Sequence, residues 1–159
     1  MFDDILAANR QYAAGFTLAG LDPRAAKGLG VVTCIDSRIE PLAMLGLLPG
    51  DAKILRNAGG RVSDDVVRSL ALATHLLGVT RICVVQHTRC RMVGATNEEI
   101  RGVIGPAAAG RDFLPIDDQQ RTLADDVRRV RESPLIADGV SVAGFVYDVD
   151  TGLLAPGAP

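Results

Sequence analysis

The chain has 159 residues, of which 48% are apolar and 23% charged, and its formal net charge is −2. This length favours a single domain over residues 1–159, and these proportions are typical of a globular protein. The weak negative charge argues against a nucleic-acid partner, which basic side chains would hold through phosphate contacts. No apolar stretch approaches the ~20 residues that a membrane span needs, so no membrane partner is expected.

The first residues and the cysteines bear on location in the cell. Asp3 and Asp4 make the start of the chain acidic, where a signal peptide would be basic. Three cysteines are an odd set, which is a poor basis for a disulfide framework. These features predict a cytoplasmic protein, whose reducing surroundings would keep thiols available as metal ligands.

The chain opens with a predicted helix and a predicted buried strand. Apolar residues over positions 1–18 have rough helical spacing, and two early aspartates favour the positive end of a helix dipole. Residues 20–30, with one proline and three glycines, mark a connection. The β-branched run over residues 31–35 then predicts a buried strand.

Two helices and a strand are expected next. Residues 42–48 predict a short helix, and residues 52–55 a short second strand. The clearest helix signal covers residues 63–77, because Ser63 can cap its first turn and its apolar residues form one stripe. Gly78 ends it.

The second half of the chain continues the alternation. Residues 81–86 are as apolar as a parallel strand covered on both faces. A capping box over residues 96–99 opens a helix, residues 107–117 read as an irregular loop, and residues 123–130 have helical spacing.

A fourth strand and a short partner complete the expected fold. The fourth strand is predicted over residues 140–149, with a short antiparallel partner at 153–154. Strands that alternate with helices predict an α/β fold with a mostly parallel central sheet flanked by helices. We expect the strand order 2-1-3-4, with the short antiparallel strand at an edge.

Three potential metal ligands follow two of the predicted strands. Cys34 ends the first, and His87 and Cys90 follow the third. Two thiolates and an imidazole are a favoured zinc ligand set, and three protein ligands leave a fourth position for water or substrate. Because the carboxyl ends of neighbouring parallel strands form the usual site of an open α/β sheet, all three residues are predicted to hold one Zn²⁺.

Two further residues, Asp36 and Arg38, fall at alternate positions after Cys34. They would share one side with Cys34 if the extended conformation persists past residue 35. We expect the metal to turn a bound water into hydroxide, with Asp36 accepting the proton of that water in a hydrogen bond. Arg38 would hold Asp36 ionised and aimed, and without it the carboxylate could become a fourth zinc ligand.

Other interpretations stay open for several residues. Asp36 and Arg38 could form a structural ion pair, and the turn at Gly59 could either offer backbone N–H groups to an anion or be a tight turn only. Cys83 lies in mid-strand and is expected in the core, and His75 is expected on the surface or packed rather than bound to metal.

Three motifs taken together resemble the β-class carbonic anhydrases, most closely the small bacterial type. They are Cys34-Ile35-Asp36-Ser37-Arg38, Arg56-Asn57-Ala58-Gly59-Gly60 and His87-Thr88-Arg89-Cys90. The resemblance implies zinc on Cys34, His87 and Cys90, with Asp36 and Arg38 as the catalytic pair. It also implies the reversible hydration of carbon dioxide to bicarbonate and a proton, and substrate close to the Gly59 backbone.

The same resemblance implies a homodimer or a dimer of dimers, with the helix over residues 1–18 as an arm around the partner. In one place the chain departs from the family, because Arg91 follows Cys90 where glycine is usual. A bulky cation there could narrow the pocket. Two rival functions remain. One is a hydrolase of carbonyl sulfide or carbon disulfide, because the same fold and zinc set serve those linear substrates in related enzymes. The other is a zinc-binding or regulatory protein without turnover, for which Arg91 is the reason.

Overall fold

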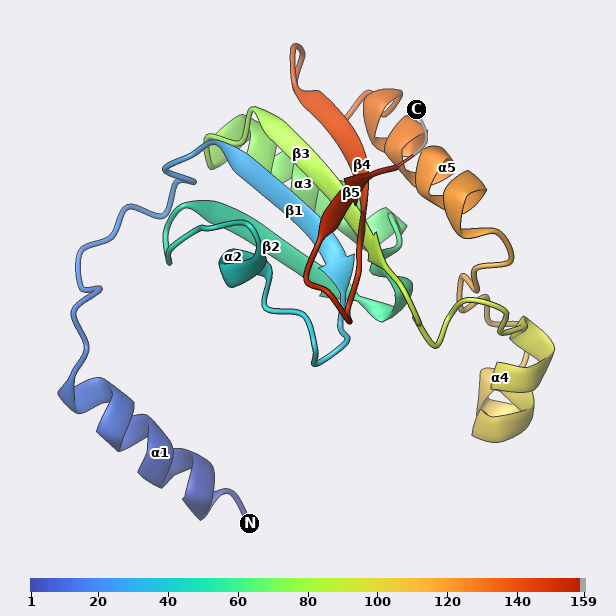
Figure 1. The fold of residues 1–159 in the computed structure, drawn as a ribbon, viewed down its shortest axis with the longest axis horizontal. Coiled ribbons are helices and arrows are strands. Elements are labelled where there is room, and N and C mark those ends of the chain that lie inside the picture. The colour runs from blue at the N-terminus through green and yellow to red at the C-terminus, as the bar shows by residue number, and fades with distance from the viewer. Residues whose placement is uncertain (158–159) are drawn as a thin grey trace.

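A five-stranded sheet forms the centre of the computed structural model, which describes residues 1–157 (Figure 1). The strand order is β2-β1-β3-β4-β5, parallel except for the antiparallel pair β4 and β5. This confirms the predicted α/β fold and the order 2-1-3-4 with an antiparallel edge. The strands are β1 (Leu29–Cys34), β2 (Ala52–Asn57), β3 (Arg81–His87), β4 (Ser141–Tyr147) and β5 (Leu154–Pro156).

The switch point of the sheet lies between β1 and β3. The chain leaves β1 to add β2 on one side and then crosses back to add β3 on the other. Thr33 on β1 is level with Val85 on β3, so the two strands end at the same edge of the sheet. Side chains that follow Cys34 and His87 therefore start close together, as the sequence predicts.

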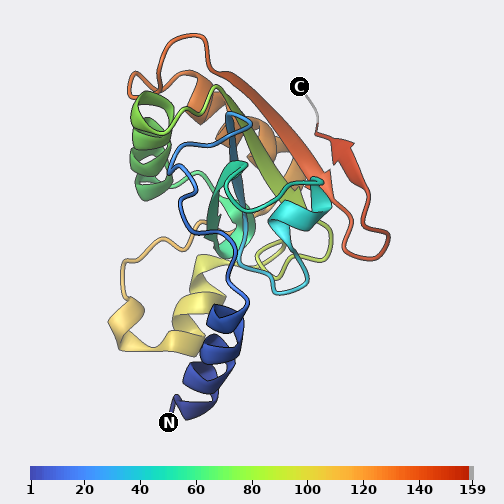
Figure 2. The same cartoon turned by 90° about the vertical axis from the view of Figure 1, so that its left-hand side faces the viewer.

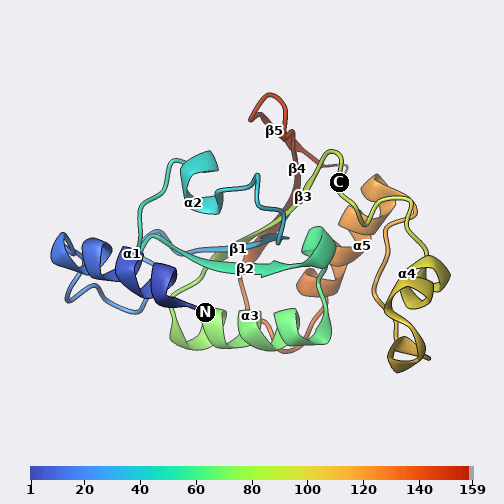
Figure 3. The ribbon, with the colours of Figure 1, turned by 90° about the horizontal axis from the view of Figure 1, so that it is seen from below.

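Helices cover both faces of the sheet. The helices α3 (Asp64–Leu76) and α5 (Gln119–Arg131) lie on one face, and the short α2 (Pro41–Met44) lies on the other (Figure 3). Ser63 caps α3 by accepting the Val66 N–H, and the buried stripe includes Leu70. The larger core cluster joins this stripe to the strands and α5. No helix among residues 1–157 is long and apolar enough to cross a membrane.

The remaining helices, α1 (Asp3–Ala14) and α4 (Asn97–Ile104), project from the sheet (Figures 1 and 2). Helix α1 is shorter than the predicted 1–18, because Gly15 closes its last turn with a bond to the Tyr12 carbonyl. None of its residues is buried. The predicted single domain 1–159 runs two residues beyond the described chain.

Two 3₁₀ turns and one isolated bridge refine the predicted loops. The turn η1 (Ala58–Gly60) follows β2, and η2 (Pro106–Ala108) follows α4. The region predicted as an irregular loop, 107–117, begins within η2 and ends in a parallel bridge between Ile116 and Val93. That bridge fastens the loop to the segment that follows Cys90.

Candidate metal centre

The turn after β1 carries Asp36 and Arg38. Strand β1 ends at Cys34, so the condition for strand alternation to align Cys34 with Asp36 and Arg38, an extended chain past residue 35, is not met. Instead Asp36 Oδ1 accepts the Arg38 backbone N–H at 3.0 Å, and the Ile39 N–H donates to the Asp36 carbonyl at 3.1 Å. Side-chain bonds of this kind favour a turn over a strand. Ile39 is fully buried and anchors the turn.

Arg38 grips the Asp36 carboxylate through both oxygens. Its Nε donates to Oδ1 at 2.9 Å, and its Nη2 donates to Oδ2 at 2.7 Å. These charge-assisted bonds hold the pKa of Asp36 well below its usual range, so the carboxylate is ionised at neutral pH. The same Nη2 donates to the Arg89 carbonyl at 3.2 Å, which joins the turn after β1 to the turn after β3.

His87, the last residue of β3, is fully buried, with one ring nitrogen bonded and the other not. Its Nδ1 lies 2.9 Å from the Thr88 carbonyl, a contact that assigns the proton to Nδ1. Its Nε2 has no hydrogen-bond partner among the described residues. A buried lone pair without a partner is costly in a protein interior, and a metal ion would satisfy it.

The turn after β3 adopts a conformation that needs support. Arg89 has a φ of 54°, a left-handed geometry that is unusual for a residue with a side chain. The end of β4 and its connection to β5 supply the support. The Thr88 N–H donates to the Tyr147 carbonyl at 2.9 Å, and Arg89 forms an ion pair with Asp150. Cys90 is thereby brought back beside His87.

Cys34, His87 and Cys90 come together as one buried group. Their ligand atoms all lie within 4.8 Å of one another, and their exposed fractions are 4%, 0% and 7%. Small side-chain movements would bring all three to the ~2.0–2.3 Å at which nitrogen and sulfur bind zinc. The group could therefore hold a metal ion, and its two sulfurs and one nitrogen fit zinc.

The local hydrogen bonds favour thiolate at Cys34. A bond from the Cys90 thiol, with smaller contributions from His87 and from the N–H groups of Asp36 and Gly59, lowers the pKa of the Cys34 thiol to about 4. Hydrogen bonding of the Cys90 thiol to Cys34, together with burial, raises the pKa of Cys90. A bound cation would favour thiolate at both positions.

Gly59, predicted as a backbone contact for substrate, has a backbone N–H that contributes to the lowered pKa of the Cys34 thiol. Its φ of 78° is the left-handed geometry that favours glycine. A β-carbon at this position would approach Met92 and Ile116 to 3.3 Å each. Gly59 is therefore a close neighbour of a metal ligand, and its contact with substrate stays a prediction.

Arg56 belongs to the site, although residue spacing gives no sign of it. At the end of β2, its Nε donates to the Cys34 carbonyl at 2.9 Å and its Nη2 to the Asp36 carbonyl at 2.7 Å. One side chain thus holds the backbone on both sides of Ile35. The available signal was its place in the Arg56-Asn57-Ala58-Gly59-Gly60 motif, because the contact spans 22 residues of sequence.

Cys83 and His75 lie away from the group, as expected. Cys83 is half-buried in the middle of β3, packs against the smaller core cluster, and has its pKa raised by burial. His75 is exposed on α3, with Nε2 3.2 Å from the Leu135 carbonyl.

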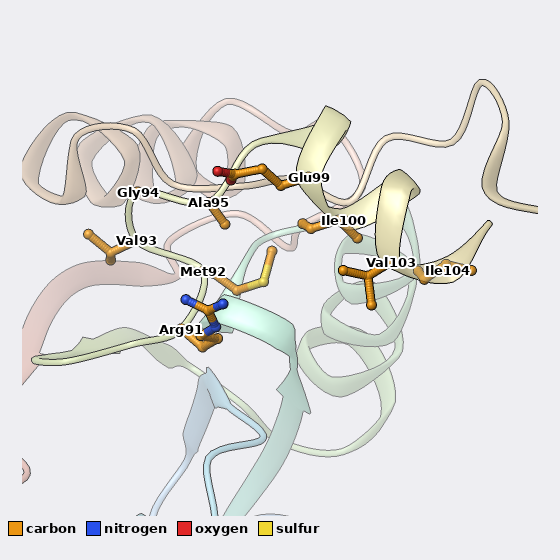
Figure 4. Close-up of a pocket in the computed structure, with 9 residues that line it drawn as sticks. All are labelled: Arg91, Met92, Val93, Gly94, Ala95, Glu99, Ile100, Val103 and Ile104. Atoms are coloured by element: carbon orange, nitrogen blue, oxygen red, sulfur yellow. The ribbon is translucent and has the colours of Figure 1, made fainter.

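Arg91, which follows the last ligand, lines a hollow of about 460 Å³ between residues 91–95 and α4 (Figure 4). The other side chains around it are mostly apolar and include Met92, Ile100 and Val103. Arg91 is exposed and stands at the end of the hollow nearest Cys90 in sequence. It therefore lines a mostly apolar recess whose walls are residues 91–95 and α4, and not Cys34, His87 or Cys90.

The sheet and the buried group at its switch point define the class, an α/β protein with a ligand set for a metal ion. A sequence profile described as carbonic anhydrase matches residues 29–133. Beta-carbonic anhydrase 1 of Mycobacterium tuberculosis H37Rv is 36% identical over 155 residues, covering 96% of this chain and 94% of that protein. Carbon disulfide hydrolase of Acidianus sp. is 35% identical over 150 residues, covering 77% and 74%.

Solved structures agree with the sequence matches. Carbonic anhydrase from Streptococcus mutans superposes with a TM-score of 0.90 at 39% identity, covering 99% of this chain and 97% of that one. The protein belongs to the β-carbonic anhydrase family, which confirms the resemblance carried by the three motifs.

Proposed function

We propose that the protein catalyses the reversible hydration of carbon dioxide to bicarbonate and a proton. The observation that carries this proposal is the position of the Asp36 carboxylate. Its Oδ2 lies 3.8 Å from His87 Nε2, beside the metal group, while Arg38 engages both carboxylate oxygens. A charged acceptor next to an open ligand position suits the activation of water.

Cys34, His87 and Cys90 would hold Zn²⁺ in this proposal. When bound, zinc supplies a Lewis acid that makes a nucleophile from water near neutral pH. With Asp36 held by Arg38 as an acceptor, these three residues would leave a fourth position on the ion for water or substrate. A closed arrangement would require Asp36 to leave Arg38 and become the fourth ligand.

Asp36 and Arg38 divide the remaining work. Two thiolate ligands neutralise the formal charge of the zinc ion, so the ion would lower the pKa of a bound water less than it would with three imidazole ligands. A neighbouring proton acceptor is then more important for catalysis. Asp36 accepts a hydrogen bond from the attacking water and orients it. Arg38 keeps Asp36 ionised and fixes its orientation through the two bonds at 2.9 and 2.7 Å.

A second candidate is the hydrolysis of carbon disulfide or carbonyl sulfide. The 35% identity with the Acidianus carbon disulfide hydrolase favours it, and the apolar hollow at Arg91 is compatible with a linear apolar substrate. A third candidate, a zinc protein without turnover, depends on Arg91 alone. Carbon dioxide hydration and carbon disulfide hydrolysis must therefore both be measured.

The deciding experiment is stopped-flow carbon dioxide hydration by zinc-loaded protein above neutral pH, with carbon disulfide hydrolysis measured in parallel. Asp36→Asn should keep zinc but lose about 100-fold or more in kcat, because the amide cannot accept the proton as a carboxylate does. Asp117→Asn is the matched control, since Asp117 is an exposed carboxylate outside the metal group, and its rate should equal the parent's. Full zinc occupancy with no hydration would refute the proposal, and turnover of carbon disulfide alone would favour the second candidate.

We further propose that α1 is the arm of a homodimer or a dimer of dimers. Its apolar side chains have no cover within the described chain: Ile5 and Leu6 are 58% and 55% exposed, and the neighbouring Phe2 is 64% exposed. A second copy that covered them would remove a continuous apolar stripe from water. The cytoplasmic location stays a prediction, and a reducing compartment would suit the two thiol ligands.

A further inference from the structure

The segment that follows Cys90 is held in place by the loop before α5. The Ile116 N–H donates to the Met92 carbonyl at 2.9 Å, and the Gly94 N–H donates to the Ile116 carbonyl at 2.8 Å. These bonds flank the bridge between Val93 and Ile116. A metal ligand at the start of an irregular segment therefore depends on a partner segment more than 20 residues further along the chain.

The turn beside Cys34 and the segment after Cys90 both pack against the Ile116 side chain. Ile116 is fully buried, and its Cδ1 would lie 3.3 Å from a β-carbon at Gly59, as would Met92 Cγ. The same turn packs against Cys34, because a β-carbon at the adjacent Gly60 would lie 3.1 Å from the Cys34 backbone nitrogen. Movement of Ile116 would therefore disturb both the turn beside Cys34 and the segment after Cys90.

Arg61 fastens the loop that carries Ile116. Its Nη1 donates to the Leu114 carbonyl at 2.8 Å and to the Pro115 carbonyl at 3.2 Å. Leu114 has a φ of 54°, a strained conformation for a side chain with a β-carbon, so the loop needs outside contacts to keep it. Asn57 fixes the Arg61 backbone through both its N–H and its carbonyl.

Asp126 on α5 holds the other side of the same guanidinium. Arg61 Nε lies 2.7 Å from Asp126 Oδ2, and Nη2 lies 3.4 Å from Oδ1. The Asp126 side chain is 4% exposed and that of Arg61 15%. Within residues 1–157 Arg61 is the one cation paired with this buried carboxylate, so the guanidinium has little freedom to leave.

We propose that Arg61, fixed by Asp126, is a positioning residue for the metal centre. Its planar fork ties α5 to the Leu114 and Pro115 carbonyls, the loop ties Ile116 to residues 92–94, and that segment sets the place of Cys90. Lysine cannot reproduce the fork, because one ammonium cannot meet the carboxylate and both carbonyls in the same geometry. This inference rests on the proposed zinc site.

The test compares the parent, Arg61→Lys and the milder Asp126→Asn, with Arg68→Lys as control. Arg68 also pairs with an aspartate, Asp65, but both side chains are exposed on α3. Zinc release to an excess of chelator and the visible absorption of the Co²⁺-substituted protein are measured, with thermal unfolding to verify folding. We expect Arg61→Lys to release zinc about tenfold faster and to alter the Co²⁺ bands, Asp126→Asn to do so less, and Arg68→Lys to match the parent.

Folded variants with the parent's zinc release and Co²⁺ spectrum would refute the positioning role. If Arg61→Lys does not fold, Asp126→Asn carries the same test. A parent that binds zinc but does not hydrate carbon dioxide would refute the proposed activity alone. A parent that binds no zinc would refute the site and the positioning role together.

Discussion

The carboxyl edge of the sheet encloses Cys34, His87 and Cys90 almost completely, whereas every residue of α1 is exposed. At the sheet edge, each turn that carries a ligand has bonds from another part of the same chain. Arg56 holds the turn after Cys34, and Tyr147 holds the turn after His87. The apolar side chains of α1, by contrast, are not covered by any other part of the described chain.

The two regions therefore differ in where their contacts come from: the same chain for the metal group, and another source for the apolar side chains of α1. One copy of the chain supplies the whole metal group, because its ligands and their supporting hydrogen-bond and ion-pair partners all come from residues 34–150. The apolar stripe of α1 can be covered only from outside that copy's described residues. We therefore expect metal binding to survive changes in α1, and assembly to survive changes that only remove the metal.

Replacement of a ligand should have the largest effect on the enclosed region. Cys34→Ser should weaken zinc binding more than ~100-fold, because a neutral hydroxyl replaces a thiolate and three donors become two. Zinc content after dialysis measures this. Cys83→Ser is the matched control, since Cys83 lies in mid-strand away from the group, and it should keep the parent's zinc content. Equal zinc loss in both variants would mean that the substitutions impair folding in general, and would contradict a specific role of Cys34 as a ligand.

A backbone test comes next in size. Gly60 has a φ of 64°, and a β-carbon there would lie 3.0 Å from the Val85 carbonyl oxygen and 3.1 Å from the Cys34 nitrogen. Gly46 has nearly the same φ, 63°, but open space around it. Gly60→Ala should therefore lower the free energy of unfolding by about 1–3 kcal/mol more than Gly46→Ala does, which is the range for overpacking. Equal losses of unfolding free energy in urea would show that the backbone around Gly60 can shift to accommodate a β-carbon, and would contradict this prediction.

The exposed region is tested by a charge on the apolar stripe of α1. Leu6→Glu should weaken self-association about 10- to 100-fold, the equivalent of the ~1.5–3 kcal/mol for burying one leucine. Gln11→Glu adds the same charge on the polar side and should change little. Sedimentation velocity over a concentration series measures both, with zinc content unchanged. Identical association in the two variants would contradict the proposed role of α1.

The smallest effect, a shift in Tm, is expected for Asp112, an exposed carboxylate that accepts two hydrogen bonds. Asp112 accepts the Asn97 side-chain N–H at 2.8 Å and the Leu114 N–H at 2.9 Å, which lowers its pKa. A lowered folded-state pKa adds stability above the unfolded value of ~3.9 and loses it as pH falls through the folded value. Asp112→Asn should lower Tm by roughly 1 °C at pH 7 and by less at pH 3. A larger loss at pH 3 would reverse the assigned sign.

Local patterns predicted the sheet, the potential metal ligands and the pairing of Arg38 with Asp36, but not the turn that carries this pair or the more distant contacts that support the site. The β-branched run before Cys34 and the apolar run before His87 sufficed to place both at strand ends. The turn at Asp36 escaped prediction because a side-chain bond to the Arg38 N–H replaces the alternation of a strand. The Arg61–Asp126 pair joins residues 65 apart, and no periodicity encodes such a distance.

Helix α1 shows a different limit. Its apolar spacing correctly predicted a helix, and Gly15 offered a signal for its early end. The same spacing also predicts a buried stripe, which the described chain does not provide. A pattern of apolar residues states that a face needs cover, but not whether the cover comes from the same chain or from another.

Zinc K-edge X-ray absorption of the purified protein tests the central claim most directly. We expect one zinc per chain with two sulfur ligands at ~2.3 Å and two nitrogen or oxygen ligands at ~2.0–2.1 Å, from Cys34, Cys90, His87 and one further light atom. A shell without sulfur, or a protein that retains no zinc, would contradict the site at the switch point of the sheet.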